Sequence, residues 1–373
     1  MSNKVVSSDA FKFHFKFWQI LGVYPTKGCR FLYILIIAIS TSIPVAMTAL
    51  LFYLDSLKDI LSNLSVNITC IAVNLKFGVI LFRRRNILDV NTWVDRLDTR
   101  ASSAQEQECL RSAVQIAHKM FYLTCVMFTG AVILGEFGAL LSHGKAIMFP
   151  AWYPFDWEHS SWKYLIVHVH QTIVSVLFVL QNVSNDTFPA IYMLVLTSHV
   201  KTLNIRIRRL GLDAAESWQD TSAELIQCIK DQQMLVAYFQ TVRKITSTAI
   251  FLQFFVTGME ACITAVCVFC VEGDLFEIMF LAEYFLCVIL EILLDCYFGE
   301  QLAGESERMT DAIYSCNWTD KDKTFKKNLI IFMQSTQENM TIVAGEIFLV
   351  NLTTFVSVLK QSYSLFAVLM SMT

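Results

Sequence analysis

Charged residues are scarce in this sequence. Only 16% of the 373 residues are Asp, Glu, Lys or Arg, while 55% are hydrophobic and the mean hydropathy is +0.51. Soluble globular domains usually carry about 25% charged residues. Five prolines and thirteen glycines exclude a collagenous chain and argue against a disordered chain or a β-sandwich. Together with 29 phenylalanines, this composition predicts an all-α membrane protein.

The usual sequence signatures of enzymes are absent as well. The chain contains no HExxH, P-loop, GxGxxG or GxSxG motif, and these mark metalloproteases, nucleotide-binding enzymes and hydrolases. His168 and His170 are two residues apart on a predicted helix, so they point to different sides of it. Cys267 and Cys270 form a CxxC without a second pair. We therefore predict no enzyme, with no catalytic residue, cofactor, metal site or nucleic-acid partner.

Disulfides and a cleaved signal peptide are not expected either. Met1–Arg30 lacks an uninterrupted apolar core and a small-residue cleavage site, so residues 1–30 are expected to stay as a cytosolic N-terminal segment. Most of the eleven cysteines lie in long apolar runs, where a free thiol behaves as a small hydrophobe. These cysteines are Cys70, Cys125, Cys262, Cys267, Cys270, Cys287 and Cys296.

Seven stretches are long and apolar enough to cross a bilayer, which takes about 20 residues of helix. They are Phe31–Leu54, Asp59–Phe82, Met120–Leu141, Tyr164–His199, Thr246–Cys270, Leu275–Gly299 and Ile342–Met370. The fourth and the seventh are longer than a crossing requires, so we expect them to tilt, kink or project beyond the membrane. Pro44 and Pro189 are the candidate kinks.

The distribution of positive charge indicates the orientation of these spans. Of the 29 Lys and Arg residues, 24 lie in residues 1–30 and in the connections after the second, fourth and sixth spans. Lys58, Lys145 and Lys163 lie on the opposite side. This bias predicts a cytosolic N-terminus and an extracellular C-terminus, which is the reverse of a G-protein-coupled receptor.

Polar residues within the spans are candidates for function, because each charge costs at least about 2.5–3.5 kcal/mol at the bilayer centre. They either pair within the bundle or face a water-filled cavity. Ten are present: Glu136, Asp186, Glu260, Glu277, Glu283, Glu291, Asp295, Glu346, Lys76 and Lys360. The connection Ser142–Lys163 contains six aromatic residues, and it is either an interfacial belt or a lid over a pocket. Hydroxylated residues in the last span fit helix packing or a pore lining.

The C-terminal third resembles the insect odorant receptors. The first matching stretch is Cys296–Leu302 (CYFGEQL), followed by Glu305, Ser306, Ala312, Ile313, Tyr314 and Trp318. The second comprises Ala344, Gly345, Leu352–Phe355 (LTTF), Leu359, Lys360 and Ser362–Phe366 (SYSLF). Leu21, Gly22 and Pro25 before the first span also fit, so the likeness covers the whole chain and is weakest in its middle.

This resemblance implies a seven-helix subunit of a ligand-gated, non-selective cation channel, opened by a small volatile, largely apolar odorant. The subunit would assemble with the family's shared co-receptor as a heterotetramer in the plasma membrane of olfactory sensory neurons. Residues 31–299 would hold helices one to six, residues 300–341 a cytosolic anchor into which the long helices four to seven extend, and residues 342–373 a pore-lining seventh helix. Val368 and Met372 would form the hydrophobic gate, with Ser371 beside it.

The resemblance also implies an odorant pocket in the outer half of the bundle, among helices two, three, four and six. The residues that it points to are Leu64, Ile68, Ile133, Phe137, Leu140, His170, Ile173, Leu177, Met279, Phe280 and Tyr284. A gustatory receptor channel has a similar architecture and is the main alternative, but the C-terminal signature favours the odorant branch. A secondary transporter would show an internal repeat, and none is apparent.

Overall fold

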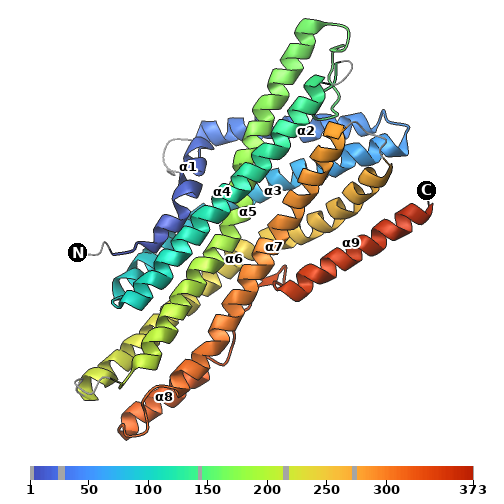
Figure 1. Cartoon of the computed structure of the whole chain (residues 1–373). Helices are drawn as coiled ribbons and strands as arrows, with labels where there is room; N and C mark the ends of the chain where they lie inside the picture. The colour runs from blue at the N-terminus through green and yellow to red at the C-terminus, as the bar shows by residue number, and fades with distance from the viewer. Residues whose placement is uncertain (1–3, 24–29, 142–144, 213–217, 271–274, 373) are drawn as a thin grey trace.

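A computed structural model describes residues 4–23, 30–141, 145–212, 218–270 and 275–372. The elements are η1 (Ser7–Phe11), α1 (Lys12–Ile20), α2 (Arg30–Leu51), α3 (Leu57–Arg100), α4 (Ala104–Leu141), α5 (Ser161–Arg209), α6 (Trp218–Cys270), α7 (Leu275–Tyr314), α8 (Lys323–Ser335), β1 (Val343–Ala344), β2 (Phe348–Leu349) and α9 (Leu352–Met372). The chain is therefore almost entirely helical, which confirms the predicted fold class (Figure 1).

The predicted spans correspond in order to α2, α3, α4, α5, α6, α7 and α9. Within the described residues, five helical segments have the length and hydropathy of a membrane crossing: Phe31–Leu51, Asp59–Arg84, Ala104–Leu141, Ser161–Arg209 and Trp218–Ile263. The sixth predicted span lies in α7 and carries the charged residues Glu283, Glu291 and Asp295. Pro44 and Pro189 lie inside α2 and α5, and both helices continue past them.

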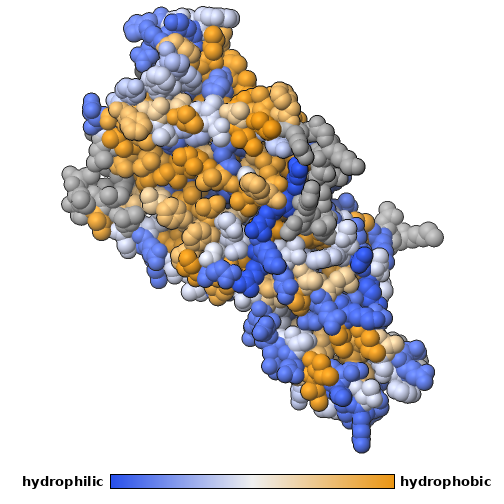
Figure 2. All heavy atoms as spheres, turned by 180° about the vertical axis from the view of Figure 1, so that it is seen from behind, coloured by the Kyte–Doolittle hydropathy of each residue, from blue (hydrophilic) through white to orange (hydrophobic). Residues whose placement is uncertain are grey.

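The helices from α3 to α7 are longer than a bilayer requires. Their lengths run from 38 residues in α4 to 53 in α6, whereas about 20 residues suffice for a crossing. Figure 2 shows apolar side chains gathered in a broad area below the top of one face, while hydrophilic side chains surround a smaller apolar group at the lower end. The helices therefore extend from an apolar zone into a polar one.

The prediction was wrong about the start of the seventh helix. The helix was predicted to begin at Ile342, but the residues that follow Ile342 form a short antiparallel hairpin of β1 and β2. The turn contains Gly345 at φ 59° and Glu346 at φ 63°, a left-handed conformation that no α-helix can contain. α9 therefore begins at Leu352 and has only 21 residues, so it does not share the extra length expected of helices four to seven.

Helix α5 forms the centre of the bundle. Every residue from Gln181 to Val200 is buried, and α5 packs against α2, α3, α4, α6 and α7. Such all-round burial explains why polar residues of this helix need partners from within the protein. The described cysteines are free thiols, as predicted, whereas the side chains of Cys267 and Cys270 lie outside the described residues.

The N-terminal segment is packed onto the end of α3. The backbone N–H of Ser7 donates to Asp98 Oδ2 at 2.6 Å, and the Ser7 hydroxyl donates to Asp98 Oδ1 at 2.7 Å. Burial raises the pKa of Asp98 to about 6, although these two hydrogen bonds act in the opposite direction. Trp18 of α1 also packs edge-on against Phe188 of α5, with ring centroids 4.7 Å apart. η1 and α1 are therefore an integral part of the bundle.

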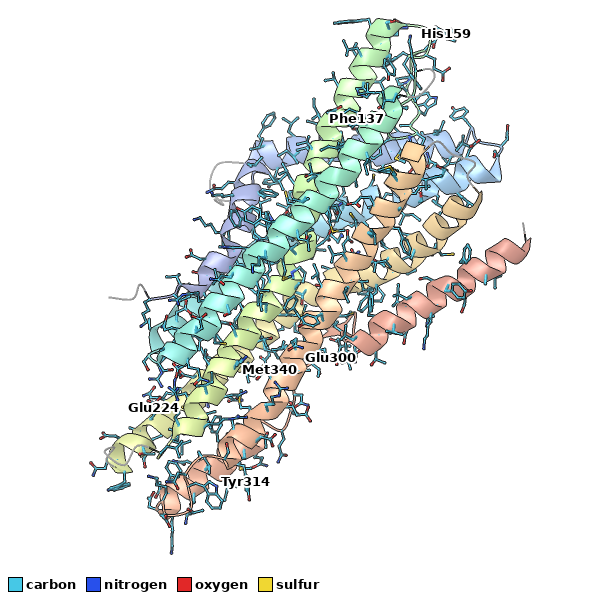
Figure 3. All side chains as sticks on the ribbon, viewed as in Figure 1. Phe137, His159, Glu224, Glu300, Tyr314 and Met340 are labelled. Atoms are coloured by element: carbon cyan, nitrogen blue, oxygen red, sulfur yellow. The ribbon has the colours of Figure 1, made fainter. Side chains whose placement is uncertain are left out.

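An ion-pair network joins four helices near the C-terminal end of α3. Arg206 on α5 lies 2.7 Å from Asp231 on α6 and 3.1 Å from Glu106 on α4. Arg100 on α3 lies 2.6 Å from Glu224 and 3.1 Å from Asp231. Figure 3 shows Glu224 and Tyr314 at this end, far from Phe137 and His159 at the other. The network ties α3, α4, α5 and α6 together beyond the apolar zone.

Candidate functional site

A cavity of about 80 Å³ lies between α3, α4, α5, α7 and the α4–α5 connection. Most of its lining is apolar, with a few polar side chains among the apolar ones. The lining residues are Val66, Thr69, Cys70, Val73, Phe128, Ala131, Val132, Met148, Phe149, Phe178, Val179, Asn182, Phe280, Tyr284, Cys287, Val288 and Glu291. An apolar cavity with few polar groups is typical of a small-molecule site.

Two of the eleven predicted pocket residues line this cavity. Phe280 and Tyr284 lie one helical turn apart on α7, with their rings stacked at a centroid distance of 6.0 Å. Leu64 and Ile68 pack beside them, in a small apolar cluster that contains Phe280. The cavity lies among the same helices that the resemblance names for the odorant pocket, and its use as that pocket stays a prediction.

The other predicted pocket residues do not line the cavity. Ile133, Phe137, Leu140, Ile173 and Met279 are between 43% and 56% exposed, so these side chains point to the outside of the bundle. Leu177 packs against the main core. His170 makes hydrogen bonds to the Ser42 hydroxyl at 2.9 Å and to the Tyr153 hydroxyl at 3.2 Å. A contact between these residues and a ligand remains a prediction.

The α4–α5 connection, Lys145–Ser160, closes one side of the cavity. Met148 and Phe149 line the cavity directly. The buried Gln171 side chain of α5 makes two hydrogen bonds to the backbone of this segment. Its Oε1 accepts from Phe149 N at 3.0 Å, and its Nε2 donates to Phe149 O at 2.9 Å. Asn63 Nδ2 also donates to Pro150 O at 2.8 Å. These contacts favour the lid alternative over a purely interfacial belt.

Gln171→Leu is expected to release this lid. The substitution removes both hydrogen bonds and leaves the Phe149 backbone groups buried without partners, at about 1–3 kcal/mol each. Hydrogen–deuterium exchange should then become at least tenfold faster in the peptide covering residues 145–160. Gln181→Leu, the same chemical change at a buried position of the same helix, is the control. Unchanged exchange in the Gln171 variant would show that the lid is held by other contacts.

A buried polar cluster adjoins the cavity. Lys76 on α3 contacts Asp186 on α5, donates to Gln253 Oε1 on α6 at 2.7 Å and lies 3.8 Å from Glu291 on α7. Gln253 also donates to Glu291, a residue of the cavity lining. The cluster therefore connects the cavity to α3, α5 and α6.

A second polar link runs from the cavity to α6. The Thr69 hydroxyl contacts both the Tyr284 hydroxyl and the Glu260 carboxylate, and Tyr284 donates to Ser65 O at 3.3 Å. Elsewhere in the bundle, Glu136 lies 3.2 Å from His168. Where the structure describes these intramembrane charges, most are thus paired within the protein, as one of the two sequence interpretations expected. Within the described residues no cluster of His, Cys, Asp and Glu could hold a metal ion.

Helix α9, the expected pore helix, packs against α6 and α7. Ser362 donates to Gly258 O of α6 at 3.2 Å, and Leu352 N donates to Glu300 Oε2 of α7 at 2.9 Å. Figure 1 shows α9 at the edge of the bundle, and Val368 near its end is 54% exposed. The side chains of the other two predicted pore residues, Ser371 and Met372, lie outside the described residues.

Most of the cavity lining was missed by sequence reasoning. α5 places the buried run Gln181, Asn182, Ser184, Asn185 and Asp186 in the middle of a predicted span, and Asn182 faces the cavity. That polar run within an apolar span was the available signal. Nothing comparable in the sequence marks Met148 and Phe149, because their position depends on how the connection folds back.

Comparison with known proteins supports the resemblance seen in the sequence. The 7tm odorant receptor family model matches residues 56–363. Odorant receptor 2a of Drosophila melanogaster is 26% identical over 98% of both chains, and odorant receptor 59a of the same species is 27% identical over 99% of this chain and 98% of its own. These relatives are odorant receptors and not enzymes.

The fold is also similar to that of a solved structure. The insect olfactory receptor OR5 from Machilis hrabei superimposes with a TM-score of 0.83 at 14% identity, over 97% of this chain and 98% of that one. Its complex with eugenol gives a TM-score of 0.84 at 13% identity, over 99% of this chain and all of the other. Since the family model spans most of the sequence, the chain belongs to the odorant receptor family.

Proposed function

We propose that the protein is an odorant-gated, non-selective cation channel subunit, opened by a small volatile molecule that occupies the cavity between α3, α4, α5 and α7. The observation that carries this proposal is the mostly apolar cavity within the helix bundle in a chain of the odorant receptor family. At about 80 Å³, it is smaller than the roughly 300–1,000 Å³ of pockets for drug-sized ligands. Its size and lining therefore suit a small, largely apolar compound.

Polar contacts supply a route from the cavity to the pore helix. Tyr284 and Glu291 belong to the lining, and each is linked to α6, through Thr69–Glu260 and through Gln253 respectively. α6 in turn packs along α9. A ligand that shifts the α7 side chains changes these contacts, and α6 then transmits the change to α9.

The proposed assembly is a heterotetramer with the family's co-receptor in the plasma membrane of olfactory sensory neurons. The N-terminus is cytosolic, the C-terminus is extracellular, and α9 of each subunit lines a central pore for cations. Residues 300–341, with α8 and the ends of α5–α7, form the cytosolic anchor. The lysine and arginine bias supports this orientation, and the hydrophilic side chains at the lower end in Figure 2 agree with it.

Recording currents with and without the co-receptor tests the function. Cells that express both subunits should give cation currents when a panel of volatiles is applied, and cells that express the co-receptor alone should not give the same ligand profile. Epitope tags at both ends, probed with and without permeabilisation, test the orientation independently. No specific current despite confirmed surface expression would contradict the channel proposal.

The proposed gate makes a separate prediction. Val368→Ala and Met372→Ala each widen a hydrophobic constriction that closes by excluding water, so basal current should rise severalfold at equal surface expression. Val356→Ala, an exposed apolar position near the start of α9, is the control and should leave basal current unchanged. Wild-type basal and evoked currents in both gate variants would place the constriction elsewhere on the helix.

A further inference from the structure

We propose that Asn182 selects small apolar ligands that carry one hydroxyl group, by accepting a hydrogen bond from that hydroxyl inside the cavity. The inference rests on the proposed function, since it concerns the same cavity and names the chemical class of its ligand. In this proposal Asn182 recognises the hydroxyl group of the ligand, and the apolar side chains of the cavity contact the rest of the ligand.

The state of the Asn182 side chain is the main observation. Asn182 lies on α5, lines the cavity and is only 6% exposed. Its Oδ1 is buried and has no hydrogen-bond partner. A buried acceptor without a partner is destabilising, and most such groups in proteins are satisfied by protein, water or ligand. A ligand hydroxyl in the cavity would supply the missing donor.

The other polar groups of the lining already have partners. Thr69 is engaged by Glu260 and Tyr284, and the Tyr284 hydroxyl also donates to Ser65 O. Glu291 accepts from Gln253 and lies 3.8 Å from Lys76. Among the described lining residues, only Asn182 carries a buried side-chain oxygen or nitrogen without a partner. The cavity therefore offers one vacant acceptor.

The surroundings of that acceptor define the rest of the ligand. Phe178 and Val179 lie on the same helix about one turn away, and Val288 and Phe280 face the cavity from α7. These side chains offer dispersion contacts and no hydrogen bonds. An alkyl or aromatic body with a single hydroxyl satisfies both parts of the lining, whereas a hydrocarbon leaves Oδ1 unpaired.

The test compares alcohols with hydrocarbons of matched length. The probes are the straight-chain primary alcohols from butanol to octanol and the corresponding alkanes, applied to cells that express the full chain with the co-receptor. In the wild type, the most potent alcohol should act at a lower concentration than its alkane. Asn182→Leu keeps the branched shape of the side chain but is larger and removes the acceptor, so it should raise the half-maximal concentration of the alcohol about fivefold more than that of the alkane.

Gln181→Leu is the matched control. Gln181 is a neighbouring buried amide on α5 whose side chain also lacks partners, but it does not line the cavity. This variant should retain the wild-type preference for the alcohol. An equal shift for alcohol and alkane in the Asn182 variant, or a wild type that does not distinguish them, would overturn the proposal.

A binding measurement separates this proposal from the channel function. In detergent-purified full-length protein, the alcohol should raise the thermal unfolding temperature more than its alkane does, and Asn182→Leu should abolish the difference. Selective stabilisation without any current would contradict the gating function and support the role of Asn182. Equal stabilisation by alcohol and alkane, or none by any alcohol, would overturn the role of Asn182.

Discussion

Lys76→Met is expected to remove most of the folded protein from the cell surface. Lys76 is 5% exposed and is the cation that faces Asp186 and Glu291 in the buried polar cluster. The methionine fills a similar volume but leaves two acidic groups without their counter-ion. Removing one partner of a buried ion pair costs about 3–5 kcal/mol, which is a large share of the stability of a typical protein. Surface biotinylation measures the loss.

Charge compensation provides the decisive comparison for this cluster. Adding Asp186→Asn to Lys76→Met removes the acid that Lys76 contacts, so the double variant should recover a large part of the surface expression. Lys163→Met, at an exposed position near the start of α5, should behave like the wild type. If the double variant is no better than the single one, the loss stems from packing and not from an unpaired charge.

Gly299→Ala is expected to separate α7 from the segment that leads into α9. A methyl group at this position would lie 2.4 Å from the carbonyl oxygen of Val350, far inside van der Waals contact. Because the obstacle is backbone, a side-chain rotation cannot relieve the clash. We expect a destabilisation in the upper range of single substitutions, several kcal/mol, and at least a tenfold loss of evoked current. Whole-cell recording at matched surface expression is the measurement.

Gly304→Ala is the control for that prediction. Gly304 lies on the same helix, and a methyl group there would meet nothing within 4 Å. Its replacement should be neutral or slightly stabilising, because alanine favours the helix by roughly 1 kcal/mol over glycine. Equal effects of the two substitutions would indicate that helix propensity, and not the Val350 approach, governs this region.

Two glycines in the stretches that resemble the odorant receptors show what could be predicted from the sequence and what could not. Gly299 and Gly345 both belong to the stretches that indicated the family. The sequence identified them as a signature but could not say why a side chain is excluded. In the structure, a side chain at Gly299 would collide with the Val350 carbonyl. Gly345 has φ 59°, and the Phe251 ring occupies the place where its Cβ would lie. The latter conformation also explains why the hairpin replaced the predicted first turns of the seventh helix.

Candidate site residues were harder to predict than spans. Hydropathy places Phe137 and Ile133 in a span, but it does not distinguish a side chain that faces lipid from one that faces a cavity, because both surroundings are apolar. The structure turns these two outward, at 51% and 48% exposure, and turns Phe280 and Tyr284 inward. Only the packing of neighbouring helices decides between these directions.

The sequence by itself determined the membrane character, the helical fold class and the family. These follow from composition, from runs of about 20 apolar residues and from local motifs, all of which are properties of neighbouring residues in the chain. Only the tertiary structure decided that Lys76 meets Asp186, that Gln171 holds Phe149 over the cavity and that Asn182 faces it. Such contacts join residues far apart in sequence, and their geometry arises from how the helices pack.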